Sequence, residues 1–427
     1  MKKPDMTKRV YSNLLNRTGR RGHKIELLAP AGNLEKAKTA IRYGADAVYV
    51  GGARFSLRSR ASNFSLEDLR ELTQFAEPYG AKVHVTVNML PHPDDFDGLK
   101  EYLLDLDKAG IDAIIAASPA VLSLAQELNV SYELHVSTQH STTNSKAIEF
   151  WKEQGMDRVV LARECTLEQI AAIADKQILP IEAFIHGGMC ISYSGRCVLS
   201  NHMTMRDANR GGCAQSCRWK YHVYHPDQTD HDLCEDGRLF SMSSRDLQAV
   251  DYIEDLINSG VSSLKIEGRM KSSYYIATVI SAYRRLIDEI YEKGSASEEF
   301  KEIIRQEIAK AENRPTGPGF FEGLPDHHVQ LYRDHDETVT QEYVAEVIER
   351  LDENHVRLRV RNKFAPHSSA EVFGPGTPSV PVEIGRIFDE EGTELEACNH
   401  PMDVVIAEYT GPAPEFGMIR KKSAESW

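Results

Sequence analysis

The sequence predicts an α/β protein: a (β/α)8 barrel carrying a long cysteine-rich insertion after its seventh strand, followed by a small antiparallel β-barrel domain. Three observations predict it. Short apolar runs recur directly after helix-ending glycines, as at Gly44, Gly110, Gly155 and Gly260. Eight such runs alternate with helical patterns, and after Lys293 the pattern changes to alternating β-type residues. A glycine that ends a helix in the left-handed conformation, followed by a strand apolar on both faces, is typical of a βαβ unit.

The eight expected strands are apolar runs of strand length bounded by turn residues. An open doubly wound sheet is the alternative to a barrel. The barrel is favoured because the pattern stops after one helix beyond the eighth strand, at residues 273–291. The expected strands are residues 25–30, 47–51, 82–88, 113–117, 133–138, 158–163, 181–187 and 263–268.

Helical patterns lie between most of these strands. Ser65 and Asp68 form a capping signal at the start of the second. The expected helices are residues 34–43, 66–79, 96–109, 119–128, 145–154, 167–176 and 247–259.

The connection after the seventh strand is far longer than a usual βα loop. It runs over residues 188–246, at the end of a strand where barrel active sites lie. The predicted organisation is a basic N-terminal arm (1–24), the barrel (25–295) with this insertion, a helix and linker (296–337), and a C-terminal β domain (338–420).

The composition limits the class of protein. The chain has 427 residues, of which 41% are hydrophobic and 27% charged, as in ordinary soluble globular proteins. The net charge of −14 argues against coating nucleic acid through bulk positive charge, but not against a local basic patch. No apolar run approaches the length of about 18 residues that a membrane span needs, and the N-terminus lacks the apolar core of a secretory signal. We therefore expect a cytoplasmic protein without a membrane partner.

Five of the seven cysteines lie in the insertion, while Cys165 and Cys398 stand apart. In a reducing compartment such clustering indicates metal binding rather than disulfides. Cys213 and Cys217 form one acceptable zinc knuckle, but no second knuckle matches it. A glycine-rich loop with variable spacings favours an iron–sulfur cluster, with zinc as the alternative. The insertion's cysteines are Cys190, Cys197, Cys213, Cys217 and Cys234.

Two segments of the insertion carry a recognisable signature. Residues 182–190 read EAFIHGGMC and residues 195–200 read GRCVLS, and both closely resemble the signature of peptidase family U32, the collagenase-like proteases. The family usually has Ser or Ala at the place of Gly188. LAPAGN at 28–33, GADAVYVG at 44–51 and KIEGR at 265–269 also agree, so the resemblance spans the barrel, and the β-rich tail is similar to the family's C-terminal domain.

The resemblance implies one of two activities. The family name implies proteolysis, yet the sequence contains neither a Gly-x-Ser-x-Gly elbow nor a His-Glu-x-x-His helix. Other members are iron–sulfur proteins that hydroxylate nucleobases or ubiquinone precursors without molecular oxygen. Residues 206–219, RDANRGGCAQSCRW, are similar to the branch that makes 5-hydroxyuridine in tRNA with prephenate as a required metabolite. A zinc-stabilised RNA-binding scaffold without catalysis is a third alternative.

The resemblance also implies cofactors, partners and ligands. Cys190, Cys197, Cys213 and Cys217 match the ligands of the cluster, expected to be [4Fe-4S], and Cys234 is a reserve ligand. Prephenate is the implied co-substrate and tRNA the implied partner, with a paralogous subunit of the same family as a further candidate.

Positive charge is concentrated near the proposed site. The N-terminal arm carries +7 and the cysteine loop +4, which suits selective contact with RNA, although a solubilising tail explains the arm equally well. Trp219, Tyr221 and Tyr193 are candidates for stacking on an exposed base, although a shielding or core role is the favoured interpretation. A dicarboxylate needs fixed cations and neutral partners. The candidates near strand ends are Arg58, Arg60, Asn88, His135, Gln139, Arg163, Lys265 and Arg269.

Overall fold

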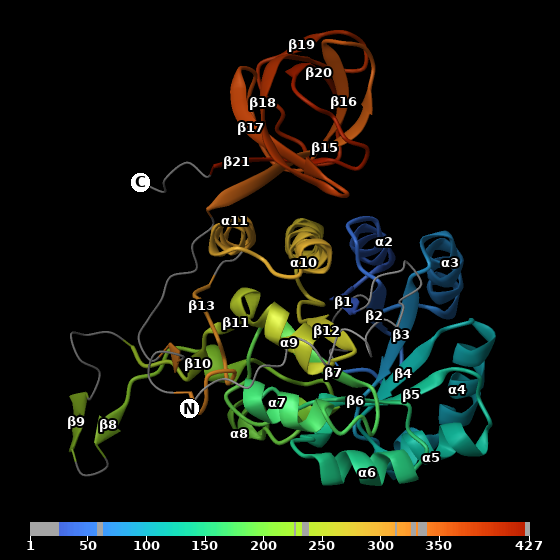
Figure 1. Ribbon diagram of the computed structural model, residues 1–427. Coiled ribbons are helices and arrows are strands. Elements are labelled where there is room, and N and C mark those ends of the chain that lie inside the picture. Colours follow the sequence, from blue (N-terminus) through green and yellow to red (C-terminus); the bar gives the residue numbers. More distant parts are fainter. Residues whose placement is uncertain are drawn as a thin grey trace.

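A computed structural model of the chain describes residues 25–57, 63–225, 228–232, 239–311, 314–325, 330–331 and 340–422. The predicted arm at 1–24 lies outside this range, as do Arg58, Arg60 and Cys234. A large α/β body carries a separate β domain against its helices (Figure 1).

Eight parallel strands close into a barrel, which confirms the predicted fold. Closure is direct: the last strand, β12, pairs in parallel with both β1 and β7. The strands are β1 (Glu26–Pro30), β2 (Ala47–Gly51), β3 (Lys82–Val87), β4 (Ala113–Ala116), β5 (Glu133–Val136), β6 (Arg158–Val160), β7 (Ile181–Gly187) and β12 (Ser263–Ile266).

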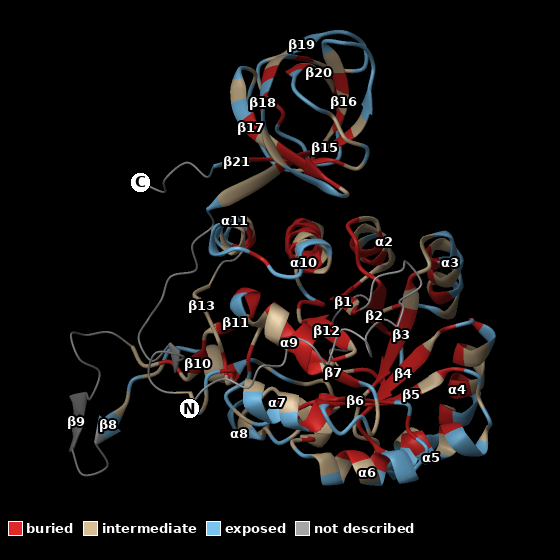
Figure 2. Ribbon diagram, in the orientation of Figure 1, coloured by how far each residue is buried: buried red, intermediate tan, exposed pale blue. Residues whose placement is uncertain are grey.

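Helices cover the outside of the barrel, and the burial pattern places its core between them and the strands (Figure 2). The capping signal at Ser65 is confirmed as a capping box with Asp68, and Gly260 ends its helix in the left-handed conformation. These helices are α2 (Leu34–Arg42), α3 (Leu66–Ala76), α4 (Leu99–Lys108), α5 (Pro119–Glu127), α6 (Ser145–Glu153), α7 (Leu167–Ala174), α9 (Ile253–Ser259) and α10 (Ser273–Lys293). Short 3-10 turns are Glu77–Tyr79, Pro93–Phe96, Thr138–His140, Ala208–Arg210, Ser216–Arg218 and Val250–Tyr252.

The expected helix at 247–259 begins later than its apolar pattern suggests. Its first residues belong to β11 (Asp246–Gln248), which pairs antiparallel with the end of β7, while β13 (Thr316–Gly317) pairs with β11. Leu247 is buried by this sheet extension, so its apolar character does not mark a helix face. The pairing satisfies backbone groups of β7 beyond the barrel and anchors the root of the insertion.

The rest of the insertion contains little regular structure. Its elements are α8 (Leu199–Thr204), the hairpin β8 (Tyr224–His225) and β9 (Gln228–Asp232), and β10 (Ser243–Ser244), which pairs with β14 (Gln330–Leu331). Together they lie on one side of the barrel (Figure 1).

The C-terminal domain is an antiparallel β-barrel with its own apolar core, as predicted. The sheet closes where β17 pairs with β18. α11 (Glu298–Ala309) precedes it in the chain, and its strands are β15 (Gln341–Arg350), β16 (His355–Val360), β17 (Ser368–Gly374), β18 (Thr377–Phe388), β19 (Glu394–Leu395), β20 (Val404–Thr410) and β21 (Met418–Lys422).

A buried charge fixes the C-terminal domain against α10 and α11. Arg420 is fully buried, and its Nη2 donates to Glu307 Oε2 at 2.8 Å and to Ser379 Oγ at 2.5 Å. Its Nε donates to Glu371 Oε2 at 3.2 Å. The domain therefore rests on the outer helical layer and not on the insertion (Figure 1).

No helix in the described ranges is long and apolar enough to cross a bilayer.

Candidate functional site

Four cysteines of the insertion share one region beyond the carboxyl end of β7. Cys190 and Cys213 are exposed, Cys197 and Cys217 are half-buried, and all four are free thiols. Burial raises the pKa of the Cys217 thiol, and the thiols of the other three raise it further, against the opposing charge of Arg218. The charge of one thiolate raises the pKa of another thiol only when the two lie close together, within about 4–6 Å. The structure thus brings together the four cysteines that the sequence singles out.

Two glycines shape the loop between β7 and Cys197. Gly187 ends the strand with φ +101°, and a Cβ there would lie 2.4 Å from the carbonyl oxygen of Glu267. At Gly195, with φ +78°, a Cβ would lie 2.4 Å from the carbonyl oxygen of Gln139. Side chains at these positions would clash with backbone, so glycine is required for the chain to turn back over the barrel mouth.

Gly188, where the family usually has Ser or Ala, faces an arginine. A Cβ at this position would lie 2.9 Å from Nη2 of Arg218. Arg218 directly follows Cys217 in the chain, so a side chain at position 188 would displace a cation from beside the thiols. The departure from the family signature thus makes room for the guanidinium of this chain.

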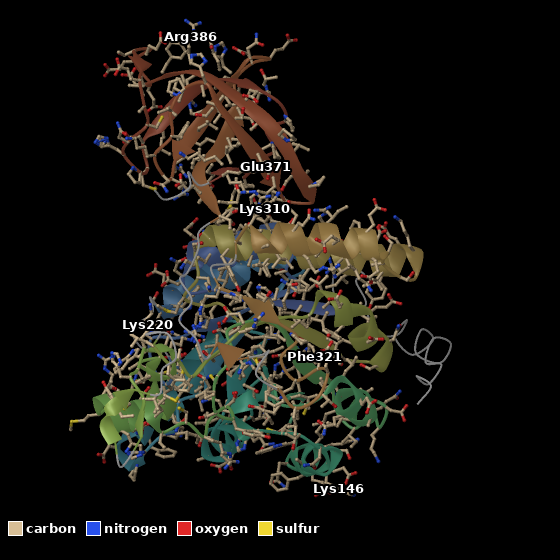
Figure 3. All side chains as sticks on the ribbon, turned by 90° about the vertical axis from the view of Figure 1, so that its left-hand side faces the viewer. Lys146, Lys220, Lys310, Phe321, Glu371 and Arg386 are labelled. Atoms are coloured by element: carbon tan, nitrogen blue, oxygen red, sulfur yellow. The ribbon has the colours of Figure 1, made fainter. Side chains whose placement is uncertain are left out.

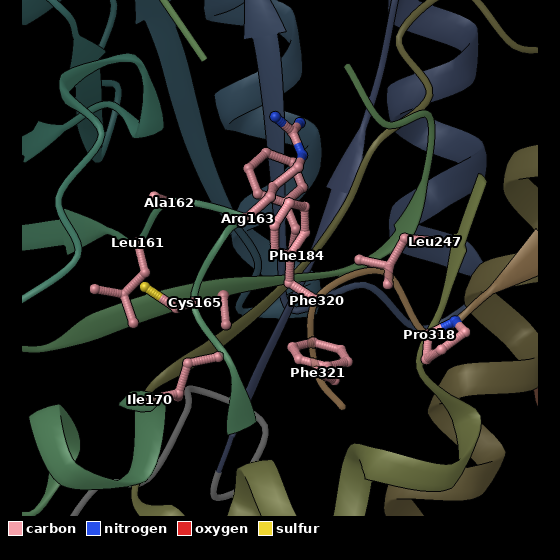
Figure 4. A pocket seen from close by; sticks show the side chains of 11 residues that line it. Leu161, Ala162, Arg163, Cys165, Ile170, Phe184, Leu247, Pro318, Phe320 and Phe321 are labelled. Carbon is pink, nitrogen blue, oxygen red and sulfur yellow. The ribbon is translucent and has the colours of Figure 1, made fainter. Parts of the chain in front are cut away.

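Two cations flank the thiol of Cys190. Although the residue is exposed as a whole, desolvation of its thiol raises the pKa, as do Cys213 and Glu267, and the charges of Arg163 and Arg218 oppose that effect. Arg163 donates from Nη1 to Ser194 Oγ at 3.0 Å, and its guanidinium lies 3.6 Å from the ring centroid of Phe184. Figure 4 shows the Arg163 side chain close to Phe184. Within the described residues Arg163 forms no ion pair, so it is available to an anion.

Other predicted site residues support the loops around the barrel mouth. Asn88 Oδ1 accepts the backbone N–H of Leu57 at 3.1 Å. Arg269 is buried and donates to the carbonyl of Leu57 at 3.2 Å and to Thr86 Oγ1 at 3.2 Å. Gln139 packs its backbone against Gly195 and accepts from Ser137 Oγ at 3.2 Å. These side chains hold the protein's own loops, so their role in the structure is positioning.

Two predicted candidates lie deep inside the barrel. His135 is fully buried, and its Nε2 lies 2.9 Å from Glu133 Oε2. Lys265 donates to Glu182 Oε1 at 2.6 Å, so this candidate cation already has a buried carboxylate partner. Burial lowers the pKa of Lys265, and the carboxylate of Glu182 opposes that shift.

Sequence reasoning missed the extent of this interior charge network. Arg158 Nη1 donates to Glu26 Oε1 at 2.5 Å and to Glu182 Oε2 at 3.3 Å. Burial alone would raise the pKa of Glu26, but Arg158 holds it far below its usual range. The sequence signal for this network is the presence of charged residues within otherwise apolar strands. Alternate positions of a barrel strand point into the barrel, so these charges can meet there.

Cys165 lies apart from the site, as expected. It lines a cavity of about 10 Å³ between β6, α7 and the segment carrying Phe320 and Phe321, with room for at most one water molecule (Figure 4). Burial raises the pKa of the Cys165 thiol to about 12, which keeps it protonated. Its chemistry is that of a small buried apolar residue.

The donor set around Cys190 can be tested against candidate metal groups. Ligands of a single zinc ion stand at about 2.0–2.3 Å from one point. Among the described residues no three His, Cys, Asp or Glu side chains converge closely enough to hold one ion. Four free thiols are the donor type that an iron–sulfur cluster takes, with each thiolate on a different iron.

Residues 32–331 match peptidase family U32, and residues 339–420 match its C-terminal domain. With the barrel and the cysteine-bearing insertion described above, the chain belongs to peptidase family U32.

Curated relatives carry several activities in their names. The chain is 46% identical over 401 residues to tRNA hydroxylation protein P1 of Bacillus subtilis, covering 93% of this chain and 95% of the relative. It is 41% identical over 272 residues to the 23S rRNA 5-hydroxycytidine C2501 synthase of Escherichia coli, covering 64% and 40%. It is 34% identical over 312 residues to a collagenase of Porphyromonas gingivalis, covering 70% and 74%.

Proposed function

We propose that the chain is a tRNA-modifying enzyme that hydroxylates a uridine to 5-hydroxyuridine. The observation that carries the proposal is the group of four free thiols at the mouth of a barrel, beside unpaired cations. The full-length similarity to a tRNA hydroxylation protein supports the same reaction class. Replacing the C–H bond of the base by C–OH is a two-electron oxidation: with water as the oxygen source it releases two electrons and two protons, and a separate electron acceptor has to take up the electrons.

We assign an iron–sulfur cluster, [4Fe-4S], to Cys190, Cys197, Cys213 and Cys217. When bound, the cluster would supply electron transfer or polarise a ligand on an open iron. The protein would contribute a loop held by Gly187 and Gly195, and the guanidinium groups of Arg163 and Arg218, whose charge opposes the rise in the pKa of Cys190. Cys234 stays a reserve ligand outside the described residues.

We assign the anionic co-substrate, prephenate, to the side of Cys190 that faces Arg163 and Arg218. Arg163 is held in place by Ser194 and by the ring of Phe184, so its fork of N–H donors is oriented before a carboxylate arrives. We expect Arg163→Gln to raise the prephenate concentration needed for half-maximal product formation about tenfold or more, with unchanged iron content.

Two measurements test the proposal in sequence. The chain is first purified anaerobically, and iron, sulfide, zinc and visible absorption are measured, with Cys165→Ala as the matched control that keeps the metal. Zinc without iron would contradict the cluster and favour a scaffold. Nucleosides of tRNA from a deletion strain are then compared with those from strains complemented by wild type or by Cys213→Ala. The deletion is made in a strain that also lacks paralogues. If the 5-hydroxyuridine content of its tRNA equals that of the complemented strains, the proposed reaction is contradicted.

The same preparation separates the peptidase alternative that the collagenase relative raises. A peptidase would cleave a denatured-collagen substrate, and cleavage would survive replacement of the four cysteines. Our proposal expects no cleavage by either the wild type or the variants.

A further inference from the structure

The insertion exposes an unusual number of large apolar side chains. Of the fourteen exposed large apolar residues among the described ones, seven lie within the stretch 191–224. Tyr193 is 51% exposed and Trp219 is 41% exposed, so neither ring belongs to the core, and both present apolar surface to solvent. Contiguous exposed apolar surface on a folded protein marks a contact with another molecule.

The two aromatic residues belong to the same region as the cysteines. Tyr193 lies between Cys190 and Cys197, in a turn where its carbonyl accepts the N–H of Arg196. Trp219 follows Cys217 by two residues, and its N–H donates to the carbonyl of Ser216. Ser200, which follows Cys197 by three residues, accepts the backbone N–H of Ala214 at its Oγ at 3.0 Å and lies 4.0 Å from Sγ of Cys213, so the two loops lie side by side. The rings therefore border the site from both loops.

Cations without carboxylate partners accompany these rings. Arg196 and Arg206 are exposed, Arg218 is half-buried, and none of the three forms an ion pair with a described residue. By contrast, Arg210 of the same segment is paired with Asp95 at 2.5 Å. Unpaired guanidinium groups beside aromatic rings complement a ligand that carries both phosphates and planar bases.

We propose that this rim, made of Tyr193, Trp219, Arg196, Arg206 and Arg218, is the platform that holds an unpaired stretch of RNA against the thiols. The inference rests on the proposed function and assigns the substrate-binding residues for it. Bases in a duplex hide their faces, whereas an unpaired base exposes a face for stacking. The rings stack on bases and the arginines bind the flanking phosphates. Substrate choice at this site therefore depends on the unpaired state of the target nucleotide.

The test measures RNA binding by the full chain, separately from product formation. The probe is a fluorescent single-stranded oligoribonucleotide, compared with the same sequence in a duplex. We expect Tyr193→Ala and Trp219→Ala each to weaken single-strand binding about 5- to 100-fold, while Trp219→Phe keeps affinity within about threefold.

Arg196→Gln with Arg206→Gln should reduce the slope of log K against log salt by about 1.4. The matched control is Arg357→Gln with Arg359→Gln in the C-terminal domain, expected to change neither value.

Several outcomes would overturn the platform. They are unchanged affinity in both alanine variants, equal affinity for the duplex, or an equal loss in the control. A change of oligomeric state in Tyr193→Ala with unchanged RNA affinity would assign the surface to a second protein chain instead. Iron content is measured on every variant, so that loss of binding is separated from loss of metal. If binding falls as expected while tRNA nucleosides stay unchanged in the deletion strain, the proposed reaction fails and the platform stands.

Discussion

The insertion and the C-terminal domain are both rich in arginine, but they differ in how many of their arginines have a carboxylate partner. Of the six arginines described in the β domain, five have a carboxylate partner: Arg361, for example, lies 2.5 Å from Glu346, and Arg386 lies 2.5 Å from Glu408. Arg350 donates to backbone carbonyls instead. In the insertion Arg196, Arg206 and Arg218 form no ion pair with described residues. Lys220 of the insertion and Arg386 of the β domain also lie far apart on the molecule (Figure 3).

The difference teaches that a count of charges does not locate a nucleic-acid surface. The alternating arginines of β16 could be read as an RNA-binding strand, but their partners on β15 leave little free charge. What matters is whether the cation has a carboxylate within reach, because a paired arginine must give up its partner before it binds phosphate. By that criterion the insertion is the region to which we assign RNA binding.

The largest expected effect is on iron content, compared between variants of one cysteine in the insertion and one in the β domain. Cys213→Ala should abolish the iron content of the anaerobically purified protein, because it removes one of four ligands. Cys398→Ala should keep it, since Cys398 is buried in the β domain and burial raises its pKa to about 11. Iron and sulfide per chain are measured for both. Equal iron content in the two variants would contradict the assignment of the ligands.

The next largest expected effect is on the free energy of unfolding, compared between removal of a buried, paired arginine and removal of an unpaired one. Arg420→Ala leaves Glu307 and Glu371 with Lys310 as their remaining cation and removes a fully buried side chain, so it should lower the free energy of unfolding by about 3 kcal/mol or more. Arg218→Ala in the insertion should cost less than about 1 kcal/mol. Urea unfolding measures both. Similar losses in the two variants would show that the pairing does not distinguish the regions.

Acid should weaken the β domain's attachment by a somewhat smaller amount. Burial alone would raise the pKa of Glu307, but Arg420 and Lys310 lower it to about 2 from the usual 4.5. Because the folded pKa is depressed, the stabilisation is fully present above pH 4.5 and is lost as pH falls toward 2. The loss is of the order of 3 kcal/mol. Unfolding followed from pH 6 to pH 2.5 should show a flatter profile for Glu307→Gln than for the wild type.

The smallest expected effect belongs to the exposed pairs of the β domain. Arg357→Gln breaks a surface ion pair with Glu349 and should change the free energy of unfolding by at most about 1 kcal/mol. Thermal unfolding in low and high salt measures it, and the difference between the variants should shrink in salt. A loss comparable to that of Arg420→Ala would refute the contrast between buried and exposed pairs.

Much of the barrel was predictable because its strands are short, mostly apolar runs, and two of them end at glycine. The expected limits of β2 (Ala47–Gly51) and β7 (Ile181–Gly187) match the structure for this reason. The first turn of the expected helix at 247–259 was wrong because Leu247 is buried by sheet pairing with β7, a long-range contact that periodicity cannot show.

Some features of the site, like some of the fold, could be predicted from the sequence, and others could not. The grouping of the four cysteines follows from their spacing in one loop. The partner of Lys265 does not, because Glu182 becomes its neighbour only when the barrel closes β12 onto β7. Which arginines remain free of carboxylates is likewise a property of the folded surface, so sequence alone could only sum their charge.

The short strand β13 ties the insertion to a segment made much later during synthesis. Thr316 and Gly317 pair with β11, which in turn pairs with Gly187 at the root of the cysteine loop. A nascent chain that has exposed all four thiols still lacks this support until residues beyond α11 have left the ribosome. The loop is therefore completed only after the barrel strands have been made, because Thr316 follows the last residue of β12, Ile266, by 50 positions.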